Sequence, residues 1–110
     1  MKSVDPDDGV TYRLMKSIDA EPQLSQRALS ESLGISLGKV NYCLRALVGK
    51  GLIKVKNFQH SDNKTAYAYI LTPKGVEEKA LVTMRFLRRK MAEYERLQHE
   101  IEELRREIER

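Results

Sequence analysis

Residues 24–51 contain two short amphipathic segments separated by a sharp break, and this arrangement constrains the fold more than any other feature of the chain. Each segment follows a serine, Ser25 or Ser36, whose hydroxyl can accept a hydrogen bond from a backbone N–H of the first helical turn. Gly34 lies between the segments, where a left-handed conformation can end the first helix. Apolar residues recur at helical spacing in both segments: Ala28, Leu29 and Leu33, then Val40, Cys43, Leu44 and Leu47. The sequence therefore predicts two helices joined by a tight turn.

The flanking residues predict three further elements. An apolar stripe of helical spacing before Pro22 indicates a first helix. After Gly51 the pattern alternates, so Ile53 and Val55 are expected to pair with residues 67–71 as a hairpin whose polar tip is residues 59–64. From Val76 to the end the chain has neither glycine nor proline, and its composition favours one helix about 50 Å long.

The predicted fold class is therefore mainly α with a small β-hairpin. We expect an N-terminal tail at residues 1–8, a compact domain at 9–75 and a long C-terminal helix at 76–110.

Two helices joined by a tight glycine-containing turn form a helix-turn-helix, whose second helix enters the major groove of DNA. Once the apolar stripe of residues 36–48 is assigned to the core, polar and basic side chains remain on the outer face. Lys39 and Arg45 can contact guanine edges or phosphates, and the amide of Asn41 suits adenine. The candidate DNA contacts on the two helices are Ser25, Gln26, Arg27, Ser36, Lys39, Asn41, Tyr42 and Arg45.

Positive charge is concentrated over the same part of the chain. The whole sequence has a net charge of +4, whereas residues 36–75 alone hold seven basic residues and one acidic residue, a net +6. Such a contiguous excess is the expected footprint of a surface that binds a polyanion. Chance clustering on a solvated surface is the alternative interpretation.

These segments resemble the winged-helix regulators of the MarR family. The resemblance is carried by LSQRALSESLGISLGKVNYCLRALVGKGLIK and the closing YILTPKG, and it covers about residues 10–78. In length and shape the chain is particularly similar to a short branch associated with exopolysaccharide gene clusters. The resemblance implies a winged helix-turn-helix in a dimeric bacterial repressor or activator, with a third helix that reads the major groove of DNA.

The resemblance also implies that the hairpin acts as a wing that reaches the neighbouring minor groove. The candidate contacts at its tip are His60, Asn63 and Lys64, while Lys54 and Lys56 are candidates for contacts to the DNA backbone. Typical members of the family have further helices after the wing that build a pocket for phenolic ligands. This sequence has one long helix there, so we do not expect a small-molecule effector pocket of that kind.

The C-terminal segment carries the pattern of a coiled coil. Tyr94, Leu97, Ile101, Leu104 and Ile108 follow a 3-4-3-4 spacing, and Leu87 extends the pattern upstream past a polar position at Lys90. We therefore expect a homodimer through this helix; the alternative is a helix that packs only on its own domain. A two-fold dimer would bind a pseudo-palindromic operator.

The direction of pairing stays open. Residues 76–90 carry a net +3 and residues 91–110 a net −3, which favours an antiparallel pair. A parallel pair would instead let Glu100 meet Arg105 of its partner.

Several classes of function are disfavoured. The single cysteine, Cys43, falls on the apolar stripe, so a core role is expected and no disulfide can form within the chain, in keeping with a cytoplasmic location. No apolar run approaches ~18 residues, so no membrane span is expected. His60 and His99 lack metal-ligand spacing to other residues, and no catalytic motif stands out, so neither a cofactor nor an enzyme is expected. The remaining alternatives are a protein-interaction module and a non-specific architectural DNA-binding protein.

Overall fold

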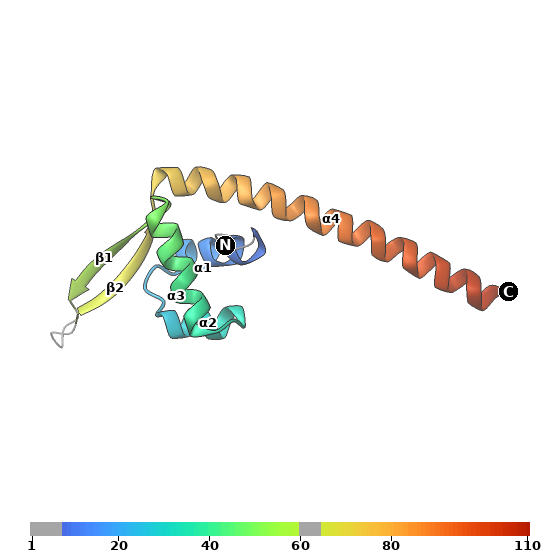
Figure 1. Ribbon diagram of the computed structural model, residues 1–110, viewed down its shortest axis with the longest axis horizontal. Coiled ribbons are helices and arrows are strands. Elements are labelled where there is room, and N and C mark those ends of the chain that lie inside the picture. Colours follow the sequence, from blue (N-terminus) through green and yellow to red (C-terminus); the bar gives the residue numbers. More distant parts are fainter. Residues whose placement is uncertain (1–7, 60–64) are drawn as a thin grey trace, which may run out of the picture.

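A computed structural model describes residues 8–59 and 65–110 of the chain. The elements are, in order, α1 (Asp8–Ala20), α2 (Gln26–Leu33), α3 (Leu37–Gly49), β1 (Ile53–Gln59), β2 (Thr65–Leu71) and α4 (Pro73–Glu109). Helices α1 to α3 form a bundle beside the hairpin, and α4 runs out from the bundle as a long arm (Figure 1). The mainly helical fold with a two-stranded wing and a long C-terminal helix confirms the predicted fold class.

Helix α2 begins and ends, and α3 begins, where the capping residues predict. The Ser25 hydroxyl accepts a hydrogen bond from Ala28 N at 3.0 Å, and the Ser36 hydroxyl accepts one from Lys39 N at 3.1 Å. Gly34 has a φ of 69°, the left-handed conformation that ends α2, and its N–H donates to the Ser30 carbonyl. These local bonds set the sharp turn that places α3 against α2.

The core lies between the first three helices and the base of the hairpin. Every apolar residue predicted for the inner face of α3 is at most 2 % exposed, and Leu29 and Leu33 of α2 are also buried. Leu24, Ile35, Tyr69 and Leu71 pack against this cluster from its edge. The core thus has three helical sides, and the inner face of α3 is anchored in it while the outer face of α3 is exposed.

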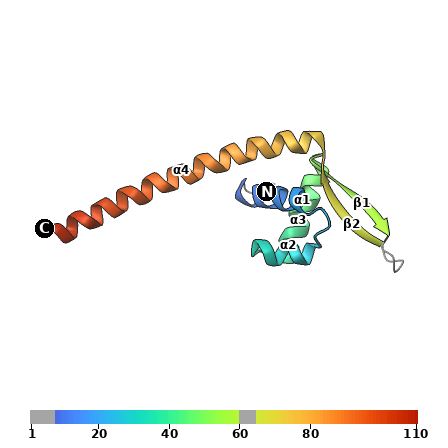
Figure 2. The ribbon, with the colours of Figure 1, turned by 180° about the vertical axis from the view of Figure 1, so that it is seen from behind.

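Strands β1 and β2 pair antiparallel, with Ile53 opposite Leu71 and Val55 opposite Tyr69. The backbone N–H of Tyr69 donates to the Pro22 carbonyl at 3.0 Å, which ties β2 to the loop between α1 and α2. The hairpin and the free end of α4 lie at opposite ends of the molecule, as the view from behind also shows (Figure 2).

Helix α4 begins at Pro73, three residues before the expected Val76. The Thr72 hydroxyl accepts a hydrogen bond from Gly75 N at 3.0 Å and donates one to the Gly51 carbonyl at 2.6 Å. Proline is preorganised for the first turn of a helix. Residues 72–75 therefore form a capped helix start.

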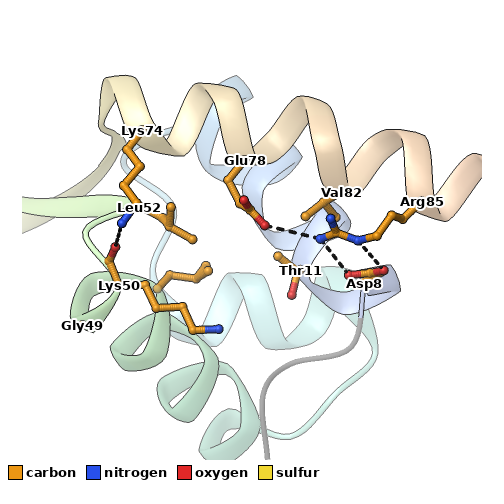
Figure 3. Close-up of a pocket in the computed structure, with 10 residues that line it drawn as sticks. Asp8, Thr11, Gly49, Lys50, Leu52, Lys74, Glu78, Val82 and Arg85 are labelled. Atoms are coloured by element: carbon orange, nitrogen blue, oxygen red, sulfur yellow. Dashed lines mark hydrogen bonds and ion pairs between the residues drawn. The ribbon is translucent and has the colours of Figure 1, made fainter.

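The first part of α4 packs on α1. Val82 is buried, and the rings of Tyr12 and Phe86 stack with their centroids 5.1 Å apart. The Arg85 guanidinium bridges Asp8 of α1 at 2.9 Å and Glu78 of α4 at 3.3 Å (Figure 3). The hydrogen bonds to Asp8 and Glu78 raise the pKa of Arg85.

Beyond Phe86 the helix leaves its own domain. Every residue from Leu87 to Arg110 is exposed. The alternative that the whole helix packs only on its own domain is therefore wrong. Within the described part of the chain, none of the helices has the length and apolar character needed to span a membrane.

Candidate nucleic-acid interface

The outer face of α3 is a positively charged surface on a helix whose other side is anchored in the core. Lys39, Tyr42 and Arg45 are exposed, as are Ser36, Leu37 and Gly38 of the first turn. Within the part of the chain that the structure describes, neither Lys39 nor Arg45 forms an ion pair. Their charges are therefore available to an anionic partner outside the chain.

Helix α2 contributes the neighbouring surface. Ser25 and Arg27 are exposed and Gln26 is half-buried. The Ser25 hydroxyl oxygen is occupied by the cap bond to Ala28, yet its O–H can still donate to an external acceptor. The predicted contacts on α2 and α3 thus lie on two helices held in contact by the core.

Asn41 occupies a different environment from the one predicted. It is half-buried, and its Nδ2 donates to Gln26 Oε1 at 3.3 Å. Gln26 Nε2 in turn donates to the Tyr69 hydroxyl at 3.1 Å. We call these three residues the Asn41–Gln26–Tyr69 chain. Sequence reasoning missed it because its members are separated by 15 and 43 residues in the sequence.

The hairpin presents its two lysines on one face. Lys54 and Lys56 are exposed. Because alternate residues of a strand point to opposite faces, they lie on the face opposite to Val55 and its cross-strand partner Tyr69. The other predicted wing contacts, His60, Asn63 and Lys64, lie outside the described residues.

A cavity of about 620 Å³ lies between the start of α2 and the hairpin. Its lining combines apolar surface with amide and hydroxyl groups from Gln23, Leu24, Ser25, Gln26, Val55, Tyr67 and Tyr69. Gln26 and Tyr69, which are joined by a hydrogen bond, both line this cavity.

A second cavity, of about 560 Å³, lies between α1, the end of α3 and α4 (Figure 3). Arg85 on its wall donates to both Asp8 and Glu78, and Lys74 donates to the Lys50 carbonyl at 3.2 Å. Its charged groups therefore hold α4 to the domain, and no pattern in the sequence had indicated it.

Cys43 is fully buried, as its place on the apolar stripe predicted. Across residues 8–59 and 65–110, no three histidine, cysteine, aspartate or glutamate side chains come together in a way that could hold a metal ion.

The predicted seam on α4 is exposed along its whole length. Leu87, Tyr94, Leu97, Ile101, Leu104 and Ile108 are between 41 and 83 % exposed. Met84 and Met91 are exposed as well, and sequence reasoning missed them although they continue the spacing of Leu87 and Tyr94. The steps from Met91 to Tyr94 and from Tyr94 to Leu97 are both three residues, so the apolar stripe changes phase at Tyr94.

Residues 7–54 match a family model described as winged helix-turn-helix DNA-binding, which covers α1 to α3 and the start of β1. No curated protein matches the chain.

Solved structures of transcriptional regulators share the fold. The PcaV transcriptional regulator from Streptomyces coelicolor, in complex with its natural ligand, is 20 % identical with a TM-score of 0.60; the match covers 74 % of this chain and 57 % of that one. A MarR/EmrR family transcriptional regulator from Acinetobacter sp. ADP1 is 23 % identical with a TM-score of 0.58, and the match covers 90 % and 74 % of the two chains.

A Streptococcus transcriptional regulator is 14 % identical with a TM-score of 0.64, and the match covers 80 % of this chain and 93 % of that one. The chain thus spans little more than half of the PcaV regulator but matches nearly the whole of the streptococcal protein. At these identities the likeness shows that the chain has the winged-helix fold found in MarR-type regulators.

Proposed function

We propose that this protein is a sequence-specific DNA-binding transcriptional regulator of the MarR type. The observation that carries the proposal is the outer face of α3, where Lys39 and Arg45 are exposed and lack an ion pair among the described residues. A buried inner face holds that helix rigidly, and a hairpin stands beside it. The match of residues 7–54 to a winged helix-turn-helix model supports the same conclusion.

In the proposed complex α3 lies in the major groove, where Arg45 and Lys39 reach guanine edges or phosphates. Ser25, Arg27 and Ser36 contact phosphates from the starts of α2 and α3. Lys54 and Lys56 contact the DNA backbone, and the wing tip with His60, Asn63 and Lys64 reaches the minor groove. Contacts to phosphates supply affinity, whereas the outer face of α3 supplies sequence preference.

The proposed regulator is a homodimer through α4. The apolar stripe on α4 lies beyond its own domain, where none of the described residues covers it. A second copy fits because the basic half of the helix, residues 76–90, would lie beside the acidic half, residues 91–110, in an antiparallel pair. Two symmetric copies would read a pseudo-palindromic operator.

The regulated genes are proposed from the resemblance of the sequence to the short branch of regulators associated with exopolysaccharide gene clusters. A protein that binds bacterial chromosomal DNA works in the cytoplasm, and we propose that location.

Selection of bound duplexes from a random pool tests sequence preference and symmetry together. We expect an enriched motif with two related half-sites, and loss of enrichment in the double variant Lys39→Ala, Arg45→Ala. Binding without enrichment would indicate an architectural DNA-binding protein instead. Absence of any DNA shift at low salt would contradict both and leave the protein-interaction alternative.

A further inference from the structure

The Asn41–Gln26–Tyr69 chain links three elements that meet at the candidate DNA interface. Asn41 lies on α3, Gln26 is the first residue of α2, and Tyr69 lies in strand β2 of the hairpin. Both polar atoms of the Gln26 amide are engaged, since Oε1 accepts from Asn41 and Nε2 donates to Tyr69. Because both ends of the amide are hydrogen-bonded, the Gln26 side chain is held in place between α3 and β2.

Tyr69 is itself held firmly. Its ring packs against the core, its backbone N–H donates to the Pro22 carbonyl at 3.0 Å, and it pairs with Val55 in the sheet. The Tyr69 hydroxyl is therefore placed by the base of the hairpin, and through Gln26 it sets the position of the Asn41 amide.

The bond to Gln26 uses only one of the two N–H groups on Asn41 Nδ2. The second N–H and the Oδ1 atom remain, and these are the two groups an asparagine needs for bidentate recognition of adenine. Holding them in one orientation before DNA arrives reduces the side-chain entropy lost on binding.

We propose that Gln26 and Tyr69 are positioning residues that orient Asn41 for base recognition, so that the hairpin contributes to sequence preference through α3. This inference rests on the proposed function. Neither residue needs to touch the base that it helps to discriminate, and the hydroxyl of Tyr69 acts from a strand rather than from the recognition helix.

The test is Tyr69→Phe, which removes the hydroxyl and keeps the ring that packs on the core. Sequence preferences are measured by random-pool selection for the wild type, Tyr69→Phe, Asn41→Ala and the double variant. At the base positions where Asn41→Ala relaxes the preference, we expect Tyr69→Phe to reduce the preference for the favoured base over the others about fivefold. A change of this size corresponds to the loss of one hydrogen bond. In the Asn41→Ala background Tyr69→Phe should have no further effect.

Tyr67→Phe is the matched control, because it removes the same atom from an exposed tyrosine on the same strand face, two residues away. Gln26→Met is a second variant that breaks both bonds, and we expect the same relaxation from it. Thermal unfolding of each variant separates loss of folding from loss of preference.

A Tyr69→Phe variant that weakens binding to all sequences alike, additively with Asn41→Ala, would overturn the inference and make Tyr69 a direct backbone contact. An unchanged preference would overturn it as well.

A measurement without DNA keeps this inference separate from the proposed function. We expect the side-chain NH₂ signals of Gln26 and Asn41 in the free protein to shift and become more mobile in Tyr69→Phe, but not in Tyr67→Phe. Unchanged signals would overturn the positioning role even where DNA binding is intact. Failure of the wild type to bind DNA would instead contradict the proposed function.

Discussion

Gly75, in the first turn of α4, lies so close to Leu52 that an added methyl group would collide with the Leu52 carbonyl oxygen. The same carbonyl accepts a hydrogen bond from Thr72 N at 3.0 Å. The start of α4 is therefore docked on the backbone that leads into the wing, and only a glycine permits so close an approach.

Gly75→Ala should destabilise the protein by about 1–3 kcal/mol, because the backbone of Leu52 would have to move to admit the methyl group. Denaturant unfolding measures the change. Gly38→Ala is the matched control: Gly38 is also helical, but nothing lies within 4 Å of an added Cβ. Its replacement should stabilise α3 by roughly 0.5–1 kcal/mol. Equal effects of the two substitutions would contradict the docking.

Arg45→Ala should weaken binding to the selected operator by about 1–3 kcal/mol and relax the preference at the base positions it contacts. The reason is that Arg45 is an exposed guanidinium on the outer face of α3. Competition between operator and random duplex measures both effects. Lys16→Ala on α1 removes the same charge away from this face and should leave the preference intact. Similar losses in both variants would show that only net charge matters.

Lys56→Ala should weaken binding to operator and random DNA by the same factor. A lysine on the hairpin that neutralises one phosphate releases about one counterion, so the slope of log affinity against log salt should fall by about one. Titrations at several salt concentrations give that slope. A change confined to the operator would instead mean that Lys56 takes part in base recognition.

Leu97→Glu should convert the dimer to a monomer and weaken operator binding, because a charge would be buried in the seam of α4. Arg106→Glu introduces the same residue on the same helix, outside the 3-4-3-4 pattern, and should leave the dimer intact. Sedimentation equilibrium reports the molecular mass of each variant. A wild-type protein that is monomeric at micromolar concentration would contradict the proposed interface.

Structural features that depend only on residues close together in the sequence were predictable. Ser25, Gly34 and Ser36 act within one turn of their own position, so their types alone indicate where α2 begins and ends and where α3 begins. The inner face of α3 was predictable for the same reason, since helical periodicity needs no knowledge of the partner surface.

Features that join distant segments were not predictable in this way. The Gln26–Tyr69 bond spans 43 residues, and it depends on how the hairpin packs against α2. The sequence alone does not indicate why residue 75 is a glycine, because the reason, the close approach of the Leu52 backbone, exists only in the folded chain. Met84 and Met91 could have been found from their spacing to Leu87 and Tyr94. The predicted seam instead continued the downstream heptad pattern from Tyr94 through Lys90 to Leu87, and this pattern does not include either methionine.

Helix α4 runs without interruption from Pro73 at the base of the wing to Glu109. In a rigid α-helix each added residue advances the chain by about 1.5 Å and turns it by about 100°. In the proposed dimer through the distal half of α4, the number of residues between Phe86 and Leu97 sets both the distance and the relative rotation of the two DNA-binding domains. Insertion of a single residue, which both copies would carry, would rotate each domain by about 100° about its helix axis, whereas a seven-residue insertion would nearly restore the orientation and lengthen each spacer by about 10 Å. Spacers that differ by whole heptads would therefore nearly preserve the orientation of the two domains while changing the distance between the half-sites they reach.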